Sequence, residues 1–225
     1  MRWTRGDRSS DIEDRRGASS GMGMRVGGGL GIGGVLILLV LSLVFGQNFF
    51  ALVDQGGEVS TGPEVAPGPG GAPAGRKGTP AEEQVADFIS FVLDDVQNTW
   101  TREFAKAGRE YQRARLVLFT DATRSGCGFA ESAAGPFYCP ADSKVYIDLG
   151  FYNELRSRFG APGDFAQAYV LAHEVGHHVQ HLLGISDKVH DAQSGGNRQQ
   201  ANALSVRLEL QADCLAGVWA HSTNE

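Results

Sequence analysis

The feature that most constrains this chain is His173-Glu174-Val175-Gly176-His177, an H-E-x-x-H run whose chemistry requires a helix. Apolar residues recur around it at helical spacing and predict a helix over 164–183 with one buried stripe: Phe165, Ala168, Ala172, Val175, Val179 and Leu183. On that helix, His173 and His177 lie one turn apart on the same face, where both imidazoles can bind one zinc ion. Glu174 lies beside them and is the candidate general base.

Two histidines leave a zinc site incomplete, so a downstream residue must supply the third ligand. A second helix, expected to begin after the cap residue Asn197, carries Glu209 and Asp213 on one face. We assign Glu209 as the third metal ligand and Asp213 as the carboxylate that orients a ligand histidine. His190 and His221 are the alternative third ligands.

Three blocks of the chain resemble the bacterial neutral zinc metallopeptidase family: His-Glu-Val-Gly-His-His-Val-Gln at 173–180, Ser-Val-Arg-Leu-Glu-Leu-Gln-Ala-Asp-Cys at 205–214 and Gly-Pro-Phe-Tyr-Cys-Pro-Ala-Asp-Ser-Lys-Val-Tyr-Ile-Asp-Leu at 135–149. Together they are far more specific than H-E-x-x-H alone. The resemblance implies a membrane-anchored peptidase with zinc as its cofactor and a gluzincin-like site of His173, His177 and Glu209. Family members continue past the second block, so part of the substrate cleft or core is expected to lie beyond residue 225.

The N-terminal third predicts a membrane anchor. Residues 1–25 are polar and arginine-rich, which predicts a flexible cytoplasmic tail. Residues 26–46 carry no charge and are long enough for a transmembrane helix, with a cleaved signal peptide as the alternative. Arginines before this run and acids after it predict a single-pass protein of the bacterial cell membrane, its domain outside the cytoplasm. Residues 47–78, rich in Gly and Pro, are the expected linker.

Residues 79–225 are the predicted zinc metallopeptidase domain, of the α+β class and zincin-like. Thr79 and Pro80 begin a helix with an apolar stripe. Strands are expected at 116–119 and 144–149, in a short sheet packed on the 164–183 helix. We hypothesise that the second strand is the sheet edge along which a peptide substrate adds.

The three cysteines divide into a pair and a single residue. Cys127 and Cys139 lie in a segment rich in Gly, Ser and Ala and are expected to form a disulfide. A second metal site is the alternative, although neither residue belongs to a C-x-x-C pair. Cys214 is expected to be a buried small apolar residue of the second helix.

The predicted reaction is hydrolysis of a peptide or protein substrate, with Glu174 passing the proton of the attacking water to the leaving amine. Candidate donors to the developing oxyanion are His178, His181, His221, Tyr146 and Tyr169. A net charge of −6 gives no reason to expect nucleic acid as a partner. A membrane-tethered zinc scaffold or binding protein without turnover is the competing hypothesis, and a hydrolase of other substrates is a third. Glu174 argues against the scaffold, because a structural site has no use for a base.

Overall fold

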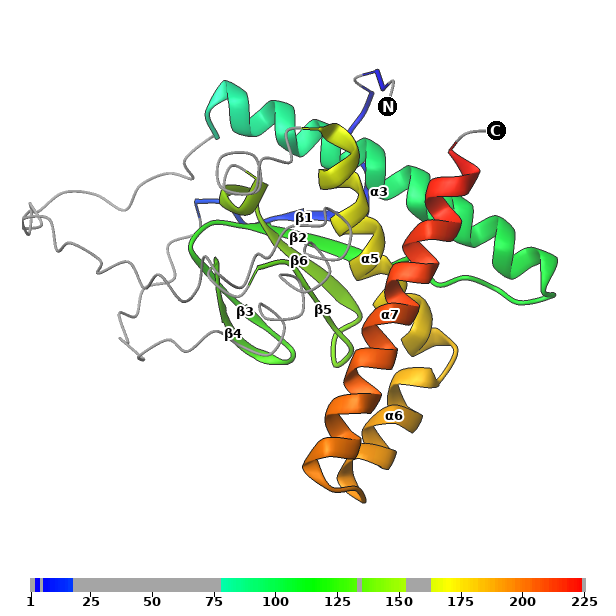
Figure 1. Cartoon of the computed structure of the whole chain (residues 1–225). Helices are drawn as coiled ribbons and strands as arrows, with labels where there is room; N and C mark the ends of the chain where they lie inside the picture. The colour runs from blue at the N-terminus through cyan, green and yellow to red at the C-terminus, as the bar shows by residue number, and fades with distance from the viewer. Residues whose placement is uncertain (1–2, 5, 18–77, 133–134, 153–162, 224–225) are drawn as a thin grey trace, which may run out of the picture.

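The computed structural model describes residues 3–4, 6–17, 78–132, 135–152 and 163–223. Within this part, a short sheet lies beside long helices (Figure 1). The elements in chain order are β1 (Ile12–Asp14), α3 (Pro80–Lys106), β2 (Arg115–Phe119), β3 (Ala122–Ser125), β4 (Gly128–Glu131), β5 (Phe137–Cys139), β6 (Lys144–Asp148), α5 (Asp164–Leu182), α6 (Ile185–Ser194) and α7 (Arg198–Ser222).

The main sheet has the strand order β1-β2-β6-β5, and β3 pairs with β4 in a separate hairpin. Strands β1, β2 and β6 run parallel, whereas β5 is antiparallel to β6. Because side chains alternate along a strand, each face of the sheet has its own core. The larger core joins α3, α5 and α7 to the face formed by Leu116, Leu118, Val145 and Ile147. The smaller core, on the other face, contains Val117, Phe119, Cys139 and Tyr146.

The helix termini follow from their capping residues. Thr79 and Glu82 form a capping box at the start of α3, with Pro80 in the first turn. Asn197 and Gln200 form the same arrangement at the start of α7. The predicted strands and the short sheet packed beside α5 are confirmed, and the described fold is α+β.

The predicted transmembrane helix is corrected. In the ranges given above, no helix is both long and apolar enough to cross a membrane. Residues 26–46, where the span was expected, and most of the linker 47–78 lie outside the described residues. The prediction of a single-pass membrane protein with a cytoplasmic N-terminus and an extracytoplasmic domain is therefore not supported.

The N-terminal residues also differ from the predicted flexible tail. Ile12–Asp14 form β1, which pairs in parallel with Leu116–Leu118 of β2. The pairing is extended by the N–H of Arg15, which donates to the carbonyl of Leu118 at 2.8 Å. Trp3 packs on Phe88 of α3, with ring centroids 5.4 Å apart. Residues that precede the expected span thus share one sheet with the domain that follows it, and a membrane crossing between them would separate the two.

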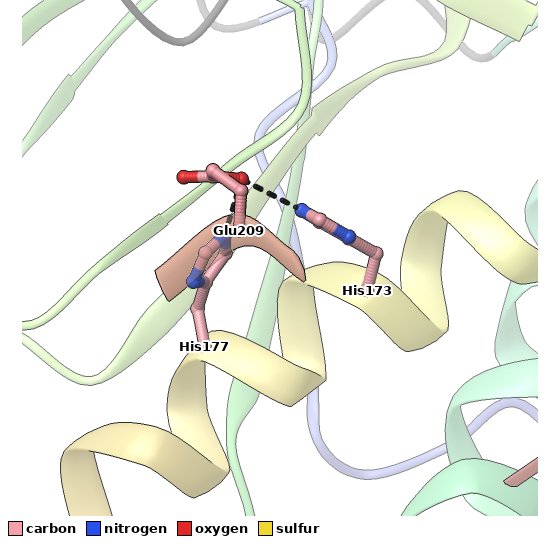
Figure 2. A group of neighbouring side chains, drawn as sticks. All are labelled: His173, His177 and Glu209. Carbon is pink, nitrogen blue, oxygen red and sulfur yellow. Dashed lines mark hydrogen bonds and ion pairs between the residues drawn. The ribbon is translucent and has the colours of Figure 1, made fainter. Parts of the chain in front are cut away.

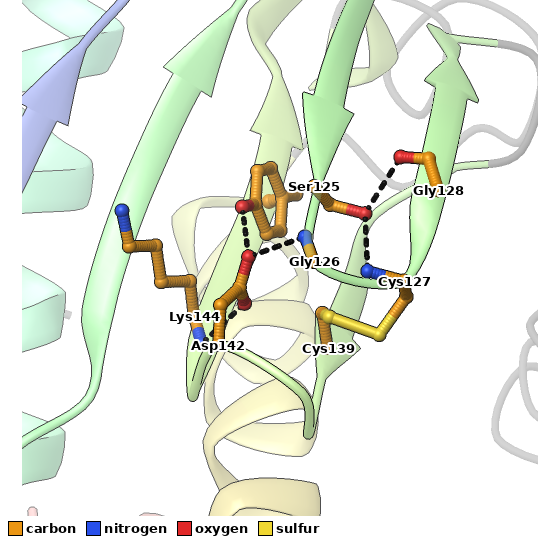
Figure 3. Close-up of a disulfide and its surroundings, with 8 residues drawn as sticks. Ser125, Gly126, Cys127, Gly128, Cys139, Asp142 and Lys144 are labelled. Atoms are coloured by element: carbon orange, nitrogen blue, oxygen red, sulfur yellow. Dashed lines mark hydrogen bonds between the residues drawn. A yellow bond between two sulfur atoms is a disulfide. The ribbon is translucent and has the colours of Figure 1, made fainter.

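Strand β6 lies between β2 and β5, so both of its edges are paired. The hypothesis that residues 144–149 form the sheet edge for a peptide is therefore wrong. The terminal strand on this side is β5. Its Cys139 forms a disulfide with Cys127, which joins the β3–β4 turn to this strand (Figure 3).

Helices α6 and α7 pack against each other and extend away from the sheet, at the bottom of Figure 1. No residue of α6 is buried. The first half of α7 packs mainly against this single short helix. Several of its apolar side chains therefore remain exposed, among them Val206 and Leu210. Cys214 is a free, exposed cysteine, which corrects the prediction that it is buried.

Candidate metal centre

The centre forms where α5 and α7 approach closely. Gly176, inside the H-E-x-x-H run, lies against the backbone of α7 at Ala212. A Cβ atom at Gly176 would meet the Ala212 oxygen at 2.9 Å and its Cα at 3.3 Å, so the two backbones can approach this closely only with glycine here. The contact at Ala212 brings the neighbouring turn of α7, with Glu209 and Asp213, to the motif histidines.

The structure brings His173, His177 and Glu209 together, and Figure 2 shows both imidazoles directed at the carboxylate. Oε2 of Glu209 lies 3.2 Å from Nε2 of His173 and 3.3 Å from Nε2 of His177. The three donor atoms all lie within 4.8 Å of one another. Ligands bound at about 2.0–2.2 Å to one tetrahedral ion are about 3.3 Å apart. The observed spacing therefore fits a zinc ion.

The Nδ1 atom of each histidine is hydrogen-bonded to a different acceptor. Nδ1 of His173 lies 2.9 Å from Oδ1 of Asp213, and Nδ1 of His177 lies 2.9 Å from Oε1 of Gln180. The amide orientation of Gln180 is set because its Nε2 donates to the carbonyl of Leu208 at 2.7 Å. Since both acceptors lack a proton to donate, each Nδ1 carries the hydrogen and each Nε2 faces the metal position.

The electrostatics of the centre favour a bound cation. Burial lowers the pKa of His173, but hydrogen bonds to Asp213 and Glu209 outweigh it and raise the pKa to about 10. Burial also lowers the pKa of His177, but the hydrogen bond to Glu209 outweighs this effect, so the pKa is raised. Burial raises the pKa of Glu209, whereas its hydrogen bonds to both histidines lower it to about 2. Glu209 is therefore ionised, and the site stabilises positive charge beside it.

Glu174 is buried next to the two histidines, with 3% of its surface exposed. Burial raises the pKa of its carboxyl group, and the charges of His173 and His177 oppose this shift. The backbone of Tyr138 on β5 also acts to lower this pKa. The carboxyl group is thus buried beside the metal position and shielded from solvent.

The alternative third ligands lie elsewhere. His190 is exposed on α6, and His221 is exposed in the last turn of α7. Neither belongs to the group of metal-binding side chains found in the described residues. The position of Glu209 agrees with its assignment as the third ligand.

The candidate oxyanion donors differ in the hydrogen bonds that they make. The hydroxyl of Tyr146 donates to Asp142 on the far face of the sheet, and His178 bonds to Tyr138 and Gln112. The Tyr169 hydroxyl donates to Oδ1 of Asp213 at 3.1 Å. It therefore lies on the side of His173 that faces away from the metal position. His181 is partly buried, and its Nδ1 has no hydrogen-bond partner among the described residues.

Gln180 is the residue that reasoning from the sequence missed. It follows His177 by three positions, which places both side chains on one face of α5. A glutamine inside an otherwise buried helix face, three residues after a ligand histidine, is the signal that could have identified it.

The sequence profile of the family described as "Putative neutral zinc metallopeptidase" matches residues 1–225. The chain belongs to this family. It is 46% identical over 230 residues to "Uncharacterized protein YpfJ" of Escherichia coli strain K12, covering 100% of this chain and 76% of that protein. It is 50% identical over 112 residues to "Uncharacterized protein Rv2575" of Mycobacterium tuberculosis strain H37Rv, covering 49% of this chain and 36% of that protein. No solved structure matches significantly.

Membership in the family identifies zinc as the cofactor, and His173, His177 and Glu209 are placed to hold it. It also implies a peptide or protein as the substrate. The resemblance noted in the three sequence blocks is thereby confirmed.

Proposed function

We propose that this chain is a zinc-dependent peptidase that hydrolyses internal peptide bonds of a peptide or protein. The observation that carries this proposal is the placement of Glu174 beside three converging donor atoms. A purely structural zinc site usually fills all four positions with protein ligands, whereas this group provides three. The arrangement therefore supports an enzyme rather than a scaffold.

We assign His173, His177 and Glu209 as the ligands, with Asp213 and Gln180 fixing the orientation of the histidines. Zinc held there supplies a Lewis acid that lowers the pKa of water toward neutrality and polarises a carbonyl group.

Glu174 takes the proton of the attacking water and delivers it to the leaving amine. Burial in the site raises the pKa of its carboxyl group toward the operating pH, which favours both transfers.

The test is cleavage of an unfolded protein by the full chain, comparing wild type with Glu174→Gln at equal zinc content. Gln keeps the size of the side chain but cannot accept the proton, so we expect kcat to fall by about 10²–10⁴-fold. Zinc content should remain unchanged, because Glu174 is not a ligand. Equal cleavage by both proteins would refute the assignment of Glu174 as the general base. A folded, zinc-loaded wild type that cleaves no protein or peptide would refute the peptidase and favour the scaffold.

A further inference from the structure

The acceptor that supports His177 is itself held in place by hydrogen bonds. Nε2 of Gln180 donates to the carbonyl of Leu208 at 2.7 Å and to Oε1 of Gln211 at 3.1 Å. These bonds leave Oε1 of Gln180 to accept from Nδ1 of His177. Both partners of the amide belong to α7, so the support of His177 is tied to the helix that carries Glu209.

The corresponding contact at His173 comes from Tyr169. Its hydroxyl donates to Oδ1 of Asp213 at 3.1 Å, and the same oxygen lies 2.9 Å from Nδ1 of His173. An ionised carboxylate can only accept, so both neighbours are donors. The terminal bond of an aspartate side chain rotates easily, and a second donor on one oxygen restricts this rotation. Tyr169 therefore restricts the position of the oxygen that accepts from His173.

Tyr169 reaches Asp213 because of its place on α5. It precedes His173 by four residues, so the two side chains lie on one face of the helix. Asp213 comes from α7 and meets both of them. The Tyr169 hydroxyl also lies 3.4 Å from the backbone carbonyl of Asp213. The tyrosine thus joins the two helices of the metal centre one turn before the first ligand.

The ring of Tyr169 is placed by packing that does not depend on its hydroxyl. It is partly buried against the larger core. The ring of Phe165 lies next to it, with centroids 6.2 Å apart, and stacks in turn on the fully buried Trp219 at 6.3 Å. A substitution that removes only the hydroxyl therefore separates the hydrogen bond from the packing.

We propose that Tyr169 is a positioning residue, whose hydroxyl holds the Asp213 carboxylate where it orients His173 toward the metal. This inference rests on the proposed function, in which His173 is a ligand and Asp213 supports it. It replaces the earlier view of Tyr169 as a candidate donor to the oxyanion, because the hydroxyl is engaged on the other side of His173. Loss of the hydroxyl should weaken zinc binding rather than turnover.

The test is the zinc affinity of Tyr169→Phe in the full chain, measured by competition with a chelator. We expect a loss of about fivefold, below the 10–100-fold typical of a partner that contacts the ligand itself. At saturating zinc, kcat should stay within about twofold of wild type. A donor to the oxyanion would show the reverse: kcat would fall by about 10²–10³-fold at unchanged zinc affinity. Unchanged zinc affinity would overturn the inference.

Tyr146→Phe is the matched control. The Tyr146 hydroxyl also donates to a carboxylate, that of Asp142 at 2.6 Å, but it lies on the other face of the sheet. This variant loses the same kind of hydrogen bond away from the metal centre, so its zinc affinity should equal that of wild type. Equal losses in Tyr146→Phe and Tyr169→Phe would indicate a general effect on the fold and would refute the positioning role.

A double-mutant cycle separates positioning from a merely structural role. In an Asp213→Ala background, Tyr169→Phe should cause no further loss of zinc affinity, because the carboxylate that it positions is gone. In a Gln180→Ala background the fivefold loss should persist, since Gln180 supports the other histidine. Additive losses in the Asp213→Ala background would overturn the inference.

These affinities do not depend on activity. If wild type binds zinc but cleaves no peptide, the peptidase proposal fails, whereas the cycle still decides the role of Tyr169.

Discussion

His173 and His177 lie on one helix and face the same carboxylate, yet they are supported by different chemistry. Asp213, which carries a charge, holds His173, whereas the neutral amide of Gln180 holds His177. A hydrogen bond to an ionised acceptor is roughly twice as strong as a neutral one. His173 is therefore the more firmly fixed of the two, and His177 depends more on its shared contact with Glu209.

Glu209→Ala removes the partner that the two histidines share, so it should have the largest effect. We expect zinc affinity to fall by more than the 10–100-fold typical of losing an outer partner, since a ligand itself is lost. Equilibrium dialysis against a zinc chelator measures this change. A Glu209→Ala variant that still binds zinc tightly would refute the assignment of Glu209 as the third ligand.

The two supporting residues should differ when each is removed. Asp213→Ala is expected to lower zinc affinity by about 100-fold and Gln180→Ala by about tenfold, because only the first loses a charged acceptor. Asp213→Asn gives His173 the same kind of amide support that His177 has. The loss of zinc affinity in Asp213→Asn should therefore be close to that in Gln180→Ala. Equal losses for the two alanine variants would show that the charge of Asp213 contributes nothing.

The smallest expected effect is on the pH dependence of the protein stripped of zinc. The folded pKa of His173 is raised from 6.5 to about 10, so its contribution is complete below pH 6.5 and disappears as pH rises through about 10. The folded pKa of Glu209 is lowered from 4.5 to about 2, so its contribution is complete above pH 4.5 and disappears as pH falls through about 2. Both residues therefore contribute fully to the stability of the folded protein between pH 4.5 and pH 6.5.

We therefore expect the Tm of the stripped protein to fall by a few degrees between about pH 6 and pH 9. Zinc binds deprotonated histidines, so the gain in Tm on adding zinc should grow over the same range. Differential scanning calorimetry measures both trends, and Asp213→Asn should flatten the first. A stripped protein whose Tm rises from pH 6 to pH 9, or an unchanged slope in Asp213→Asn, would contradict this assignment.

The sequence predicted the parts of the centre that depend on local order along one helix. The spacing of His173, Glu174 and His177 places them correctly because a helix repeats every 3.6 residues. The capping boxes of α3 and α7 could be read for the same reason. Glu209 could be nominated because its helix was recognisable, although its convergence on the histidines depends on how α5 meets α7.

The parts that could not be predicted depend on contacts between distant segments. Ile12–Asp14 are only three residues in a polar stretch, and they become a strand because β2 lies beside them. Whether 144–149 is an edge or an interior strand depends on where β5 pairs. His178 could not be distinguished from a catalytic histidine, since its partners Tyr138 and Gln112 come from other elements.

Strand β1 has a practical consequence for anyone who shortens this protein. It covers the backbone of β2, whose central residues Leu116–Leu118 are apolar and fully buried. A preparation that begins at α3 would leave this row of N–H and C=O groups unpaired, and such an exposed apolar edge is a template for aggregation. Inactivity of that truncated preparation would then report self-association rather than a failure of the zinc chemistry.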